Sequence, residues 1–177
     1  MIICDSDIVI RAVDASRPGS SHDAFVFNMS NAKQHYLSKY EAGDRGSWLL
    51  GDSGFGIEEF LLTPYRDPNP GSPQHRFNLQ HAKARNITER VIGVLKSRIR
   101  CLKTALPYAP QKVVKIINIC CALHNICRHY QIEDFVETES TTQPEEIFEE
   151  NTELEENTNL NNVGRNLRDS IANNLIL

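Results

Sequence analysis

The stretch LLGDSGFG, residues 49–56, ends an apolar run on a single aspartate and then turns sharply. The preceding residues SWLLG fit a buried strand, which puts Asp52 at the carboxyl end of that strand. Gly54 and Gly56 let the chain turn away without steric cost. Because ligands and metals in open α/β sheets usually bind at this edge, the stretch predicts an α/β fold and makes Asp52 a candidate metal ligand.

The segments around this stretch predict short strands and helices. Residues 1–15 alternate in a way that favours a hairpin with Asp5, Ser6 and Asp7 in its turn. A short helix capped by Ser20 or Ser21 is expected next, followed by another at Tyr36 to Tyr40. A second strand is expected at Leu61 to Thr63, ended by Pro64.

Two long helical patterns follow a loop of Pro, Asn and Gly. The first runs from about His75 to Leu102, and the second from about Gln111 to Tyr130. Apolar residues at helical spacing predict the core face of each helix. They are Ile87, Val91, Leu95, Ile99 and Leu102 in the first, and Val113, Ile116, Ile117, Cys120, Leu123 and Cys127 in the second.

Charge divides the chain into a basic middle and an acidic tail. Residues 74–130 hold eleven Lys or Arg and one acid, whereas residues 131–157 hold eleven acids and no Lys or Arg. The basic block favours a polyanionic partner, most simply DNA, over a merely solvated helix face. The tail, residues 131–177, is expected to be largely disordered, with a short terminal helix in RNLRDSIANNLIL. A tail that folds back and mimics DNA is the less favoured alternative.

Bulk composition excludes some classes of protein. Hydrophobic content of 40% and charged content of 24% are typical of a globular domain. No apolar run is long enough to span a bilayer, so no membrane association is expected. Five cysteines, mostly within apolar patterns, favour an intracellular, reduced protein.

Glu89 is the one acid among the cations of the first long helix. On a helical projection it shares a side with Arg85 and Lys96. Its simplest role is an i,i+4 ion pair with Arg85, worth on the order of 0.3–0.5 kcal/mol. Its functional role would be a metal ligand together with Asp52, from which 36 residues separate it. Mg²⁺ takes few protein carboxylates and leaves room for phosphate oxygens, and paired ions of this kind cleave phosphodiesters.

Five stretches in order resemble the PIF/Harbinger transposases and Harbinger transposase-derived nucleases of the DDE endonuclease superfamily. They are RPGSSHDAFVF (17–27), LLGDSGFG (49–56), LLTPYRDP (61–68), FNLQHAKARNITERVIGVLKSRIRCL (77–102) and IINICCALHNI (116–126). The resemblance spans roughly residues 1–130. It implies a DDE endonuclease domain with a ribonuclease H-like mixed sheet, flanking helices and a divalent-metal site for Mg²⁺ or Mn²⁺. It assigns Asp52 and Glu89 as two of three catalytic carboxylates.

The first carboxylate of the family lies in a DGTH-type motif, which is absent from these 177 residues. The chain is therefore expected to lack the first strand and to show weak or absent nuclease activity. Asp5, Asp7 and Asp14 match no catalytic motif. Asp23 belongs to the GS-x-HD motif, where a role in the metal site and helix capping both remain open. The alternative function is a non-catalytic DNA- or protein-binding module, a domesticated or decaying transposase fragment.

The basic block supplies candidate DNA contacts, and the resemblance implies a partner protein. The candidate phosphate contacts are Arg85, Arg90, Lys96, Arg98 and Arg100. A Myb/SANT-like partner would supply sequence recognition and nuclear import, which makes the expected location nuclear, with the cytoplasm as a second one.

Cys120, His124 and Cys127 fall on one helix face at a spacing that can bind zinc. A buried cysteine stripe with a hydrogen-bonded histidine is the favoured interpretation.

Overall fold

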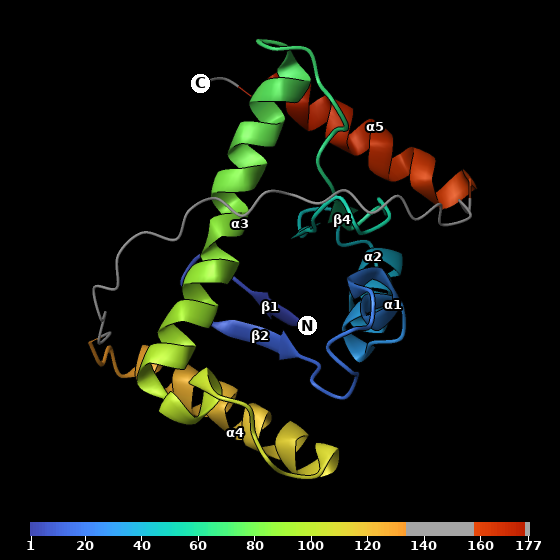
Figure 1. Cartoon of the computed structure of the whole chain (residues 1–177). Coiled ribbons are helices and arrows are strands. Elements are labelled where there is room, and N and C mark those ends of the chain that lie inside the picture. Colours follow the sequence, from blue (N-terminus) through green and yellow to red (C-terminus); the bar gives the residue numbers. More distant parts are fainter. Residues whose placement is uncertain (134–157, 176–177) are drawn as a thin grey trace.

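The computed structural model describes residues 1–133 and 158–175. One long helix, α3 (Pro73–Arg98), forms the spine of the molecule. In Figure 1, α4 (Pro110–His129) lies across its C-terminal end and α5 (Thr158–Asn174) lies beside its N-terminal end. The predicted α/β class is confirmed, because short strands and several helices alternate along the chain.

The N-terminal hairpin forms as predicted. Strands β1 (Ile2–Cys4) and β2 (Ile10–Val13) pair antiparallel. Asp5 organises the turn, because its Oδ1 accepts the backbone N–H groups of Asp7 and Val9, each at 3.0 Å. This bonding satisfies donors that a tight turn would otherwise leave unpaired.

The second pair of strands brings the Asp52 stretch into the fold. Strands β3 (Leu49–Leu50) and β4 (Leu61–Leu62) pair in parallel. In the described parts of the chain, the two pairs form two small sheets, where the sequence predicted one mixed sheet. They share an apolar cluster, since Ile3 of β1 packs with Leu49 and Leu61.

The spine helix α3 begins two residues earlier than predicted, at Pro73. Ser72 caps it by accepting the His75 N–H at 3.1 Å. It ends at Arg98, and Ile99 leaves helical geometry before a 3₁₀ turn, η1 (Arg100–Lys103). The predicted core face is confirmed at its centre: Val91 is fully buried, and Ile87, Leu95, Ile99 and Leu102 pack around it.

Two short helices follow the hairpin. Helix α1 (Asp23–Asn28) begins after His22, and no side chain caps it, so the predicted cap at Ser20 or Ser21 is wrong. Helix α2 (Asn31–Glu41) includes the predicted turn at Tyr36 to Tyr40. It is capped by Ser30, whose Oγ accepts the Lys33 N–H at 3.2 Å.

Two polar side chains of helix α4 form hydrogen bonds to the backbone of the hairpin. His124 is fully buried, and its Nε2 donates to the carbonyl of Ile8 at 2.7 Å. Asn125 accepts the Ile10 N–H at 2.9 Å and donates to the Ile10 carbonyl at 2.8 Å. These bonds confirm that the histidine of the cysteine stripe is hydrogen-bonded within the core.

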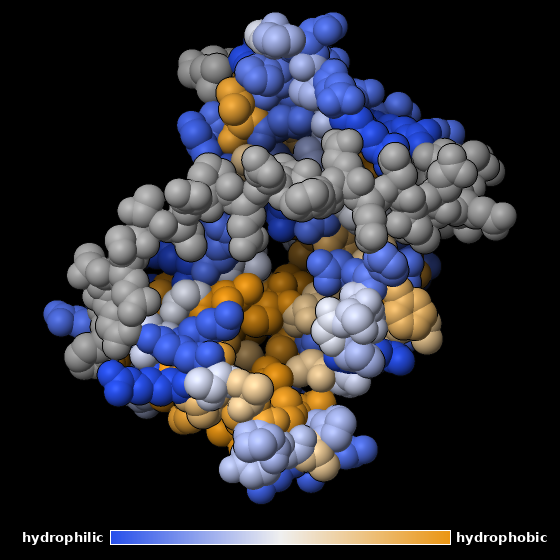
Figure 2. Space-filling view, in the orientation of Figure 1, coloured by the Kyte–Doolittle hydropathy of each residue, from blue (hydrophilic) through white to orange (hydrophobic). Residues whose placement is uncertain are grey.

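The buried face of α4 is rotated relative to the prediction. Cys120 and Cys121 are buried, whereas Leu123, predicted to be buried, is 48% exposed. The hairpin contacts the side of α4 that carries His124, which turns Leu123 outward. Figure 2 shows apolar side chains exposed on the face formed by the hairpin and α4.

The terminal helix is longer than predicted, since α5 begins at Thr158. The predicted disordered stretch, 131–160, lies mostly outside the described residues, so the assignment of 131–177 as a separate tail stays a prediction. In the part of the chain that the structure describes, no helix combines the length and apolar character needed to cross a membrane. All five cysteines are free thiols.

Candidate metal centre beside the spine helix

Asp52 lies directly after β3, in the turn that leads to β4. The Gly51 N–H donates to the Leu62 carbonyl at 3.0 Å, which fixes the end of β3 against β4. Asp52 Oδ1 accepts the Gly54 N–H at 3.0 Å, and its backbone carbonyl accepts the Phe55 N–H at 3.2 Å. The backbone therefore holds one carboxylate oxygen and leaves the other facing α3.

Arg85 of α3 occupies that second oxygen. Its Nη2 lies 3.3 Å from Asp52 Oδ2, and both side chains are about one-third exposed, at 38% and 35%. The ion pair that the sequence suggested between Arg85 and Glu89 is not among the ion pairs of the described residues. Because water screens a pair this exposed, it contributes under about 1 kcal/mol to stability and can exchange for another cation.

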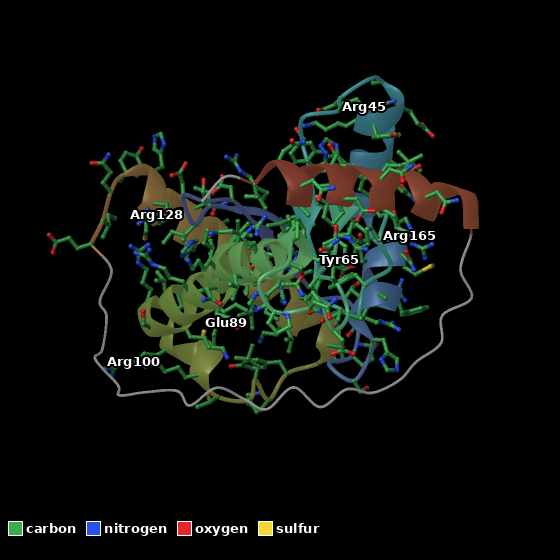
Figure 3. All side chains as sticks on the ribbon, turned by 90° about the horizontal axis from the view of Figure 1, so that it is seen from above. Arg45, Tyr65, Glu89, Arg100, Arg128 and Arg165 are labelled. Atoms are coloured by element: carbon green, nitrogen blue, oxygen red, sulfur yellow. The ribbon has the colours of Figure 1, made fainter. Side chains whose placement is uncertain are left out.

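Glu89 lies one helical turn beyond Arg85 on α3, an axial rise of about 6 Å. Figure 3 shows it on the spine helix, and its side chain is exposed. The neighbouring Thr88 places this turn against the hairpin, with its Oγ1 3.7 Å from Cys4 Sγ. Asp52 of the β3–β4 loop therefore contacts Arg85, and Glu89 follows Arg85 by one turn of α3.

His81 belongs to the same row of α3, one turn before Arg85, and sequence reasoning missed it. It is buried, and its Nε2 lies 3.3 Å from the Leu62 carbonyl on β4. Burial is the main cause that lowers its pKa, and the positive charge of Arg85 adds to it. The i,i+4 spacing from Arg85 was the available signal. His81 ties α3 to the strand beside Asp52.

The other predicted DNA contacts spread along the C-terminal half of α3 and beyond it. Arg90 and Lys96 have exposed side chains on α3. Arg98 donates to the Ile132 carbonyl at 2.5 Å, which turns it toward the end of α4. Arg100 lies in η1, away from Glu89 along the chain in Figure 3. The structure therefore brings only Arg85 into contact with the Asp52 carboxylate.

The donor set fits a hard divalent cation with an open coordination sphere. Two carboxylates suit Mg²⁺ or Mn²⁺, which keep water and phosphate oxygens as further ligands. Within residues 1–133 and 158–175, no group of three or more His, Cys, Asp or Glu side chains gathers in metal-binding geometry. The same finding covers Cys120, His124 and Cys127, where the histidine is committed to Ile8. The described residues therefore contain neither a complete metal site nor a zinc site on α4, and Asp52 and Glu89 stay candidate ligands.

Comparison with known proteins agrees with the resemblance seen in the motifs. The family model described as "DDE superfamily endonuclease" matches residues 1–125. Putative nuclease HARBI1 of Homo sapiens is 38% identical over 130 residues, which cover 71% of this chain and 36% of that protein. Protein ALP1-like of Arabidopsis thaliana is 31% identical over 138 residues, which cover 70% of this chain and 33% of that protein.

This chain spans about a third of the length of these relatives. No solved structure matches it. The matched residues include β3, the Asp52 turn and all of α3, which carry the candidate ligands Asp52 and Glu89. The chain belongs to the DDE superfamily of endonucleases, together with relatives named for the Harbinger transposase-derived nucleases.

Proposed function

We propose that Asp52 and Glu89 hold Mg²⁺ or Mn²⁺ in a DNA-cleaving centre. The observation that carries this proposal is the contact between the Asp52 carboxylate, at the end of β3, and Arg85, which precedes Glu89 by one turn on α3. Membership of the family supports it, since DDE endonucleases generally use divalent metals and a nuclease implies a DNA substrate.

Each side chain of the site has a separate role in this proposal. Asp52 and Glu89 supply oxygen ligands from a strand end and a helix. Arg85 neutralises Asp52 in the absence of metal and turns to a phosphate when metal binds. Arg90, Lys96 and Arg98 contact DNA phosphates farther along α3, and Arg100 does so from η1. The bound metal would polarise the scissile phosphate and lower the pKa of an attacking water.

The proposal includes a ribonuclease H-like sheet. The antiparallel pair β1–β2 and the parallel pair β3–β4 both pack on α3 and share one apolar cluster. A strand between β1 and β3 would join them into one mixed sheet. In the family that strand carries the first catalytic aspartate, which these 177 residues do not contain. We therefore expect weak or absent cleavage by this chain tested alone.

A non-catalytic DNA- or protein-binding module is the second candidate. The specific observation in its favour is that Arg85 already neutralises Asp52, as in a structural ion pair. Such a module would bind DNA with a steep salt dependence and without a need for Mg²⁺. The proposed Myb/SANT-like partner and the nuclear location apply to both candidates.

The test is Mn²⁺ binding by titration calorimetry, with DNA cleavage measured in parallel. The full chain would be compared with Asp52→Asn, Glu89→Gln and the matched control Asp67→Asn, an exposed loop position with φ +43° that asparagine tolerates. The proposal requires Mn²⁺ affinity to fall in the first two variants and to persist in the third. Equal affinity in all three would reject the metal site and leave the binding module.

A further inference from the structure

Helix α5 lies beyond the residues matched by the family, yet it completes part of the core. Ala172 is 1% exposed and packs with Leu62 of β4 and Phe77 of α3. The half-buried side chains around this contact are Tyr65, Leu167, Ile171 and Leu175. Figure 1 shows α5 beside the N-terminal half of α3, above β4. A segment far along the chain therefore covers the strand that pairs with β3.

The backbone of α5 touches the loop that carries Asp52. A Cβ atom added at Gly164 would lie 2.5 Å from the carbonyl oxygen of Glu58 and 2.7 Å from its carbonyl carbon. These are backbone atoms, which cannot swing aside as the end of a side chain can. Only glycine allows α5 to approach the loop from Gly51 to Phe60 this closely.

Arg168 holds the chain on the other side of β4. Its Nη1 donates to the carbonyls of Thr63 and Pro64 at 3.1 and 3.2 Å. Its guanidinium lies 3.8 Å from the ring centroid of Tyr65, whose hydroxyl donates to Asp169 Oδ1 at 2.5 Å. Burial and the bond to Asp169 raise the pKa of Tyr65 to about 12.

Glu58 is held from a second direction as well. Lys33 of α2 lies 2.6 Å from its Oε1, and the backbone of Glu58 exchanges hydrogen bonds with Leu61 at 2.9 and 3.2 Å. The loop after Asp52 is thus fixed between α2 and α5, and β4 is fixed by α5 at both of its ends.

We propose that α5 is a clamp, acting within the chain, that fixes β4 and the loop from Gly51 to Phe60 and so positions Asp52. Gly164 and Arg168 are its positioning residues. The link to metal binding rests on the proposed function, whereas the clamp itself is a property of the fold. Without this clamp, the loop from Gly51 to Phe60 becomes more mobile, and Asp52 moves away from Arg85 on α3.

The decisive variant is Gly164→Ala in the full chain, and the matched control is Gly93→Ala. Gly93 is also helical, but a Cβ there meets nothing within 4 Å. Alanine raises helix propensity at both positions, so any loosening by Gly164→Ala runs against the intrinsic preference. Hydrogen exchange followed by mass spectrometry should show amides of residues 51–65 exchanging about tenfold faster in Gly164→Ala, with the hairpin unchanged. Gly93→Ala should match the parent chain.

Arg168→Lys is the second variant, in case Gly164→Ala fails to fold. Lysine keeps the charge but loses the paired donation to Thr63 and Pro64 and the planar contact with Tyr65. Because Arg168 itself lowers the pKa of Tyr65, the measurement is amide exchange: residues 61–65 should exchange faster in Arg168→Lys than in the parent chain. Unchanged exchange in residues 51–65 would overturn the clamp.

Mn²⁺ affinity separates this inference from the proposed function. A loosened loop with weaker Mn²⁺ binding in Gly164→Ala supports the positioning of Asp52, and a loosened loop with unchanged Mn²⁺ binding overturns it. If Asp52→Asn leaves Mn²⁺ binding intact while Gly164→Ala still loosens the loop, the metal proposal fails and the clamp stands.

Discussion

The guanidinium of Arg85 lies 3.3 Å from Asp52 Oδ2, so the best candidate metal ligand already has a cationic partner. A metal ion bound at that oxygen would be repelled by the positive charge of Arg85. The first prediction concerns this competition.

Replacing Arg85 with alanine should strengthen Mn²⁺ binding about fivefold. The change removes a competing positive charge, and a unit charge at about 4 Å in water is worth about 1 kcal/mol. Stability should fall by less than about 1 kcal/mol, because the pair is one-third exposed. Titration calorimetry with Mn²⁺ and urea unfolding measure the two quantities. Weaker Mn²⁺ binding would instead show that Arg85 orients Asp52.

His81 should make stability depend on pH between neutral and mildly acidic conditions. Its pKa is lowered in the folded state, chiefly by burial, so the unfolded chain binds the proton more readily. The stability contribution is complete above pH 6.5 and falls as the pH drops below 6.5 toward the lowered pKa. His81→Gln should reduce the drop in Tm between pH 7.5 and 5.5. The other five histidines are present in both proteins and affect both Tm values alike. Parallel pH profiles in the two proteins would contradict this.

Asn125→Ala should destabilise the chain by about 1–3 kcal/mol. Asn125 makes two hydrogen bonds to the backbone of Ile10, and the substitution leaves both backbone groups without a partner beside the core. The control is Asn118→Ala on the exposed side of the same helix, expected to change stability by less than about 0.5 kcal/mol. Urea unfolding measures the stability of both variants. Similar losses of stability in the two would show that the bonds from Asn125 to Ile10 do not stabilise the hairpin.

Arg90→Ala should weaken DNA binding and reduce its dependence on salt. For each DNA phosphate that a side chain no longer neutralises, the slope of log affinity against log salt becomes shallower by about 0.9. Arg90 is exposed on α3, and Lys39→Ala on α2 serves as the control outside the proposed surface. Fluorescence anisotropy with a DNA duplex at several salt concentrations gives the slope. A slope that changes equally in both variants would mean that binding follows net charge alone.

Local patterns were enough to predict much of the fold. Alternation and turn residues predicted the hairpin, and the apolar row through Val91 predicted α3, although Ser72 and Pro73, which begin it, were assigned to the loop. The limits of α3 were less accurate, since Ile99 departs from helical geometry where the apolar spacing continues. Leu123 fits the same helical period as Cys120, but the hairpin contacts the helix on the His124 side. Periodicity alone cannot give that rotation.

The candidate site was predicted only in part for a similar reason. Asp52 could be placed at a strand end from sequence, and the structure puts it there. Its pairing with Arg85 and the contact of His81 with Leu62 join residues of different elements. The docking of α5 joins residues more than 100 positions apart, such as Tyr65 and Asp169. No local pattern encodes such contacts, because they depend on how the elements pack.

The contact of Ala172 with Leu62 and Phe77 bears on how this protein can be produced. A shortened protein that stops at residue 125, where the family match ends, would leave these buried apolar side chains facing water. Such a surface favours aggregation during expression. We therefore expect a protein that keeps residues 158–175 to be more soluble than one that stops at residue 125, where the family model ends.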